Sequence, residues 1–100
     1  FAEYLRCFSD PATIHGTCED YRAAASIDLI HDGADRGRKV ACPMLALWAE
    51  KGLLHRKYNV VAVWRDYATQ VSGKALPGGH FLPEEVPAET LAELRTFLLS

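Results

Sequence analysis

Apolar residues in the first third of the chain recur with helical spacing and predict three successive helices. Asp10 and Pro11 are typical of the start of the second helix. An aspartate caps the free backbone N–H groups there, and proline suits the first helical position because the N–H that it lacks would make no helical hydrogen bond. The apolar face of that helix comprises Ile14, Cys18 and Tyr21. Ser26 is expected to cap the third helix, and Gly33 and Gly37 are expected to end it.

The pattern changes in the segment 39–48, which is apolar without alternation. Such a run is typical of a strand buried on both faces of a parallel sheet, and residues 50–52 would form the loop at its carboxyl end. Helical spacing then returns from Asn59 to about Val71, with Ser72 and Gly73 closing that helix.

A short strand is expected at residues 74–76, followed by a last helix that opens at Pro87. Its predicted buried face comprises Leu91, Leu94, Phe97 and Leu98. The order strand, helix, strand, helix indicates a parallel βαβ unit. A functional site is then expected in the loops at the carboxyl ends of the strands.

Composition narrows the class of protein. The chain has 100 residues, 49% of them hydrophobic, which fits a small globular unit. Its 13 acidic and 11 basic residues are interspersed and give a net charge of −2, so nucleic acid and anionic membranes are not expected partners. No apolar run approaches the roughly 20 residues of a membrane helix.

Cysteine and histidine spacing gives no sign of a bound metal. The three cysteines form no C-x-x-C pair, which argues against a disulfide framework or structural zinc and favours reduced thiols in the cytoplasm. No metal-binding histidine pattern and no glycine-rich phosphate loop is present, so no cofactor is expected. Because the chain starts at Phe1, without a signal-peptide pattern, we expect it to come from a longer protein.

His80 is the strongest candidate for chemistry. It follows Gly78 and Gly79 after the second predicted strand, and an imidazole on a sharp turn can exchange protons near neutral pH. The alternative is a turn histidine with no chemical role. Glu84 and Glu85 are interpreted as exposed turn carboxylates. Residues 33–37 match the form G-x-D-x-G of a nucleophile elbow, but Asp35 lacks the preceding strand and following helix that an elbow needs.

Several segments resemble the α/β-hydrolase superfamily, and within it the haloacetate dehalogenases of the fluoroacetate dehalogenase type. The generic resemblance rests on residues 40–48 and on Gly78-Gly79-His80-Phe81 with Pro83-Glu84-Glu85. The specific resemblance rests on residues 9–15, 18–29, 35–40 and the His80 segment. Together these segments span nearly the whole chain.

The resemblance implies that an aspartate displaces halide and forms an ester, and that His80 activates the water that cleaves this ester. Tyr21 matches a tyrosine that helps to hold the leaving halide, although its helical spacing also suits a core residue. In many relatives an aspartate after the penultimate strand orients the histidine. Gly52 stands at that position here, and Glu50 is a weak substitute. The dehalogenase type supplies this acid, like the nucleophile, from residues upstream of Phe1.

The predicted fold class is therefore α/β, the carboxyl-terminal part of an α/β-hydrolase fold. Residues 1–25 would be the end of a helical cap, and residues 26–100 part of the core. A small haloacid and water would be the substrates, without nucleic acid or membrane, and a homodimer of the full-length protein stays open. The alternatives are an epoxide hydrolase of the same fold and a catalytically inert chain that lacks the nucleophile.

Overall fold

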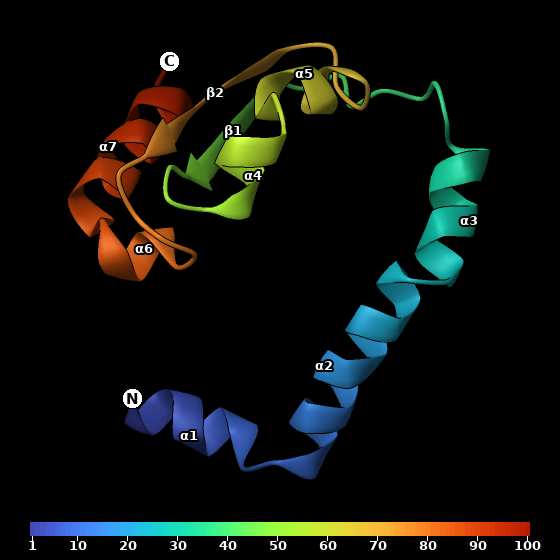
Figure 1. Ribbon diagram of the computed structural model, residues 1–100, viewed down its shortest axis with the longest axis vertical. Helices are drawn as coiled ribbons and strands as arrows, with labels where there is room; N and C mark the ends of the chain where they lie inside the picture. Colours follow the sequence, from blue (N-terminus) through green and yellow to red (C-terminus); the bar gives the residue numbers. More distant parts are fainter. The chain divides into compact units, whose positions relative to one another are not determined.

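The computed structural model describes all residues 1–100, and their contacts divide the chain into two compact units, Phe1–Arg36 and Gly37–Ser100. The first unit consists of α1 (Ala2–Phe8), α2 (Pro11–Ala24) and α3 (Ile27–Ala34) (Figure 1). The second consists of β1 (Met44–Ala49), α4 (Leu53–Lys57), α5 (Val60–Arg65), β2 (Val71–Leu76), α6 (Leu82–Glu85) and α7 (Pro87–Leu98). None of these helices combines the length and apolar character of a membrane span.

The first unit contains the three predicted helices, with two corrections to their ends. Asp10 caps α2 as expected, because its Oδ1 accepts a hydrogen bond from the Ala12 N–H at 2.9 Å. Ser26 does not cap α3. Its hydroxyl instead donates backward to the Arg22 carbonyl at 2.6 Å, a bond that competes with capping. Gly33 lies inside α3, whereas Gly37, with a φ of +94°, follows its end. The unit extends to Arg36.

The second unit is built on the predicted parallel strand pair. Met44 of β1 lies opposite Val71 of β2, and the register continues to Ala49 and Leu76. The chain crosses between the strands through α4 and α5 (Figure 1). The strand–helix–strand–helix order is therefore confirmed, with α4 and α6 as additional short helices.

Three predicted boundaries in this unit are wrong. β1 begins at Met44, although Val40 forms an isolated parallel bridge with Ala68. α5 ends at Arg65 and not near Val71. Ser72 and Gly73 belong to β2 rather than to a helix end. A Cβ on residue 73 would lie 2.1 Å from the Ala46 carbonyl oxygen, so this glycine permits close approach of two strands, a role that sequence alone confuses with a helix stop.

The core of the described chain is small. Its buried hydrophobic residues are Ala46, Val60, Ala68, Leu76 and Leu82. Ala46 is the only buried residue of β1, so this strand is not buried on both faces as predicted: the sheet has two strands and little covers it.

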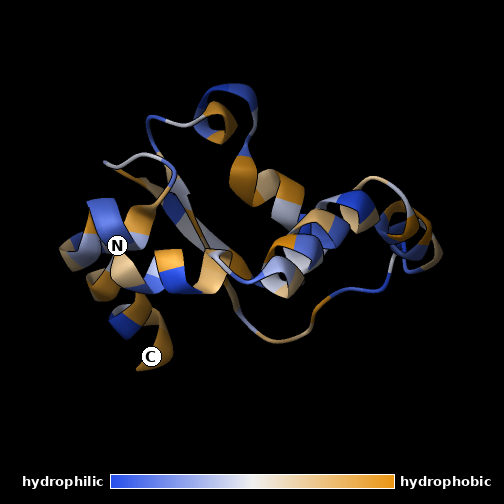
Figure 2. Ribbon diagram, turned by 90° about the horizontal axis from the view of Figure 1, so that it is seen from below, coloured by the Kyte–Doolittle hydropathy of each residue, from blue (hydrophilic) through white to orange (hydrophobic).

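Of the four residues predicted on the buried face of α7, Phe97 is turned inward and the three leucines are not. The inward positions of this helix are Thr90, Glu93 and Phe97, spaced three and four residues apart. Leu91, Leu94 and Leu98 are instead 55%, 41% and 72% exposed. In Figure 2, apolar segments lie on helices of both units as well as on the strands. Apolar identity therefore predicted this helix, but not the face that packs on the sheet.

Candidate functional site at the carboxyl end of the sheet

His80 lies in the turn that leaves the carboxyl end of β2, as expected from the sequence. The strand ends at Leu76, and the turn leads into α6. The imidazole is exposed and packs edge-to-face against the Phe81 ring, with ring centres 4.9 Å apart and planes at 87°. The imidazole is therefore accessible to solvent and contacts a neighbouring ring on one side.

Glu85, which the sequence analysis interpreted only as an exposed turn carboxylate, holds this turn. Glu85 Oε2 accepts a hydrogen bond from the Gly79 N–H at 2.7 Å, and Oε1 accepts one from the Phe81 N–H at 3.1 Å. These donors lie immediately before and after His80. The N–H groups of Phe81 and Gly79 lower the pKa of Glu85, a small loss of hydration opposes them, and the charges of Lys51 and His80 add to the lowering. Glu85 is thus a carboxylate at neutral pH.

The loop after β1 is tied to the loop after β2. The Glu50 N–H donates to the Leu76 carbonyl at 2.9 Å, and the Lys51 N–H lies 3.4 Å from the Gly78 carbonyl oxygen. Both strands of a parallel pair end at the same edge, so this link brings the position equivalent to the relatives' acid close to the His80 turn. The bond from Glu50 uses its backbone, and its side chain is exposed. The structure therefore provides no acid partner for His80 at Glu50 or Gly52.

Tyr21 belongs to the other unit. It lies in α2, and 75% of its surface is exposed, so it does not serve as a core residue within the first unit. Its O–H is available to a ligand. Asp35 directly follows α3 and precedes β1, an order that a nucleophile elbow does not have.

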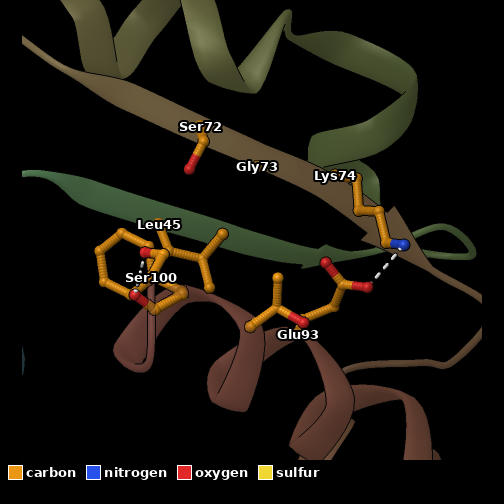
Figure 3. Close-up of a pocket in the computed structure, with 8 residues that line it drawn as sticks. Leu45, Ser72, Gly73, Lys74, Glu93 and Ser100 are labelled. Atoms are coloured by element: carbon orange, nitrogen blue, oxygen red, sulfur yellow. Dashed lines mark hydrogen bonds and ion pairs between the residues drawn. The ribbon is translucent and has the colours of Figure 1, made fainter.

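Two further features lie in the second unit. The Trp48 indole N–H donates to His55 Nδ1 at 3.1 Å, which joins β1 to α4 and was not anticipated. A pocket lies between the strands and α7, where Lys74 Nζ and Glu93 Oε1 form an ion pair at 2.7 Å (Figure 3). It is lined by Leu45, Ser72, Gly73, Lys74, Glu93, Thr96, Phe97 and Ser100. Neither predicted site residue lines it.

Comparison with known proteins identifies the class. No protein-family model matches the chain. A solved structure from Nostoc sp PCC 7120, assigned as an α/β hydrolase, is 62% identical, with a TM-score of 0.93 over 97% of this chain and 33% of its own. The chain therefore has the fold of part of an α/β hydrolase, as predicted.

The particular resemblance is also confirmed. The chain is 42% identical to a fluoroacetate dehalogenase of Burkholderia sp over 96% of this chain and 32% of that protein. A Pseudomonas aeruginosa protein assigned as an epoxide hydrolase is 42% identical, with a TM-score of 0.86 over 96% of this chain and 33% of its own. A Salmonella enterica protein assigned as an acyltransferase is 47% identical, with a TM-score of 0.91 over 97% of this chain and 32% of its own. The chain thus spans about a third of the length of its relatives.

Proposed function

We propose that the protein to which this chain belongs is a cytoplasmic haloacetate dehalogenase, in which His80 activates water. The observation that carries this proposal is the exposed imidazole of His80, which lies at the carboxyl end of β2 on a turn that Glu85 fixes by two hydrogen bonds. It is supported by the 42% identity to a fluoroacetate dehalogenase.

The reaction would run in two steps. An aspartate outside this chain attacks the carbon that bears the halogen. The carbon–halogen bond breaks, halide leaves with its electron pair, and an aspartyl ester forms. His80 then takes a proton from water as the water oxygen attacks the ester carbonyl. The tetrahedral intermediate then collapses and its ester C–O bond breaks. His80 returns its proton to the departing alkoxide, which leaves as a 2-hydroxy acid, and the regenerated aspartic acid loses its proton to solvent. Water supplies the oxygen atom, and no external oxidant is needed.

Tyr21 would stabilise the leaving halide. A phenolic O–H is a neutral donor, suited to a developing anion in a pocket from which water is excluded. Its exposure within the first unit supports this role, because no packing in that unit occupies the side chain. The segment 1–25 would belong to the cap that closes over the substrate.

Epoxide hydrolysis is the second candidate. It is favoured by the likeness to the Pseudomonas aeruginosa protein assigned as an epoxide hydrolase. A mutant of that protein has been solved with a bound ligand designated MFA. In this reaction Tyr21 would donate to the epoxide oxygen. Gly52 stands against it, because an acid would be expected at that position.

The coding sequence upstream of Phe1 and the activity of the full-length protein test the proposal. An aspartate between a strand and a helix is expected upstream, and a serine there would indicate an esterase. The full-length protein should release halide from haloacetates, measured with a halide electrode. Replacing His80 with asparagine should lower turnover by about 10²- to 10⁴-fold.

His31 offers a matched control, because it lies on the exposed surface of α3. H31N should retain full turnover. Hydrolysis of epoxides without halide release would favour the second candidate. Absence of both activities, with no nucleophile upstream, would support the inert alternative.

A further inference from the structure

We propose that Glu85 is a positioning residue for His80, whose carboxylate fixes the backbone on both sides of the histidine and so sets the direction of the imidazole. The fixed backbone follows from the geometry alone. Its consequence for turnover rests on the proposed function of His80.

The two bonds of Glu85 have different meanings. Phe81 is the N-cap residue of α6, and the bond from its N–H to Oε1 of Glu85, the last residue of that helix, is similar to the return bond of a capping box. Gly79 lies two residues earlier, and the hydrogen bond from its N–H to Oε2 does not cap the helix. Stabilisation of α6 therefore does not account for this second bond. Together the two bonds bridge His80.

The glycine at position 79 is explained by the same contact. A Cβ there would lie 2.7 Å from Oε2 and 2.8 Å from Oε1 of Glu85. Gly79 does not have a positive φ, so its backbone would accept an alanine. The nearest obstacle to a side chain is therefore the carboxylate itself. Gly78 has a different role, since a Cβ there would meet Val86 and Leu82 at 3.0 and 3.2 Å.

The step that depends on Glu85 can be separated from the other. His80 acts on the water that cleaves the ester and takes no part in halide displacement. Loss of the Glu85 carboxylate should leave the first step, halide displacement, intact and slow the second step, cleavage of the ester. A general loss of folded protein would instead reduce the burst of halide that the first step gives.

The experiment uses the full-length protein with the variants E85A, E85Q, G79A and the double variant G79A/E85A. Rapid mixing with a haloacetate measures the initial burst of halide and the steady rate that follows. We expect a burst of one halide per enzyme in each variant, with steady turnover lowered about 10- to 100-fold in E85A, as expected for a displaced catalytic group. E85Q, which keeps one acceptor oxygen, should lie between E85A and the unchanged protein.

G79A should behave like E85A, because its methyl group displaces the carboxylate. The double variant should be no slower than E85A alone, since the side chain that G79A displaces has already been removed. E84Q is the matched control, because it removes the neighbouring carboxylate and leaves both Glu85 bonds in place, and it should retain full turnover.

Unchanged steady turnover in E85A and E85Q, with H80N inactive, would overturn the role of Glu85 while the function of His80 stands. Additive losses in the double variant would also overturn it, because G79A would then act elsewhere. Unchanged turnover in H80N would overturn the proposed function, and the role of Glu85 in turnover with it.

Discussion

Two peptide N–H groups that donate to one carboxylate make that carboxylate harder to protonate, and Glu85 is in this position. Its side chain is exposed, so the effect comes from the direction of the hydrogen bonds and not from burial. Protonation would weaken both bonds at once. The order of the His80 turn is therefore linked to pH.

The link has a definite sign. Because folding lowers the pKa of Glu85 below its ordinary value of 4.5, its stabilising contribution is fully present above about pH 4.5 and is lost as the pH falls through the lowered value. In the full-length protein, E85Q should therefore make the free energy of unfolding less dependent on pH in this acid range, as measured by urea unfolding at several pH values.

Glu3 provides the comparison. Its pKa is also lowered, chiefly by the Arg6 side chain within α1, so E3Q should remove a separate part of the acid dependence. If E85Q and the unchanged protein showed the same slope, the Glu85 bonds would not persist in solution.

The sequence predicted the place of His80 but not the role of Glu85, for a physical reason. The glycine pair and the end of a strand are local signals. Glu84 and Glu85 are adjacent carboxylates with no difference in sequence pattern. Only the path of the turn decides which of them reaches back to Gly79.

At the level of elements, the approach of β1 to β2 depends on a position without a side chain. Gly73 pairs with Ala46, and a Cβ at residue 73 would overlap the carbonyl oxygen of Ala46 at 2.1 Å. This obstacle is backbone, which cannot rotate away. The strands would have to separate or shift.

In the full-length protein, we expect Gly73→Ala to lower the free energy of unfolding by about 1 to 3 kcal/mol, as overpacking does elsewhere. Denaturant unfolding measures this loss. Gly33→Ala in α3 is the control, because nothing lies within 4 Å of its added methyl group and alanine favours a helix by about 1 kcal/mol over glycine. Equal stability of G73A and the unchanged protein would mean that the strands are less close than described.

The last helix shows what the sequence pattern could predict and what it could not. Pro87 and the leucine spacing located α7 correctly, but Thr90 occupies the buried face, within 2.8 Å of the Val86 carbonyl oxygen. Helical periodicity indicates an apolar stripe and does not state what covers it. Leu91, Leu94 and Leu98 form such a stripe and remain exposed.

At the scale of the whole molecule, the chain leaves much apolar surface and backbone exposed. The sheet has two strands, so each has one edge outside the pair, and few hydrophobic residues are buried. Unpaired strand edges and contiguous apolar stripes favour association between chains. The class of fold was nevertheless predictable, because it follows from the order of elements and from segments of the sequence.

We expect the 100-residue chain, when expressed by itself, to self-associate. Sedimentation at increasing concentration should show growing mass, and L94K/L98K should reduce it by placing charges on the stripe. A92K adds charge on the same helix beside the stripe and should reduce association less. A monomer that unfolds cooperatively would contradict this expectation.

The parallel pairing also has a consequence for biosynthesis. Met44 and Val71 are register partners, and 71 − 44 places them 27 positions apart. At a synthesis rate of about 5 to 20 residues per second, the first strand waits about 1 to 5 s for the second. Until then Met44–Ala49 lacks its register partner Val71–Leu76. The β1–β2 pair therefore forms late in synthesis, only shortly before the turn that carries His80 is made.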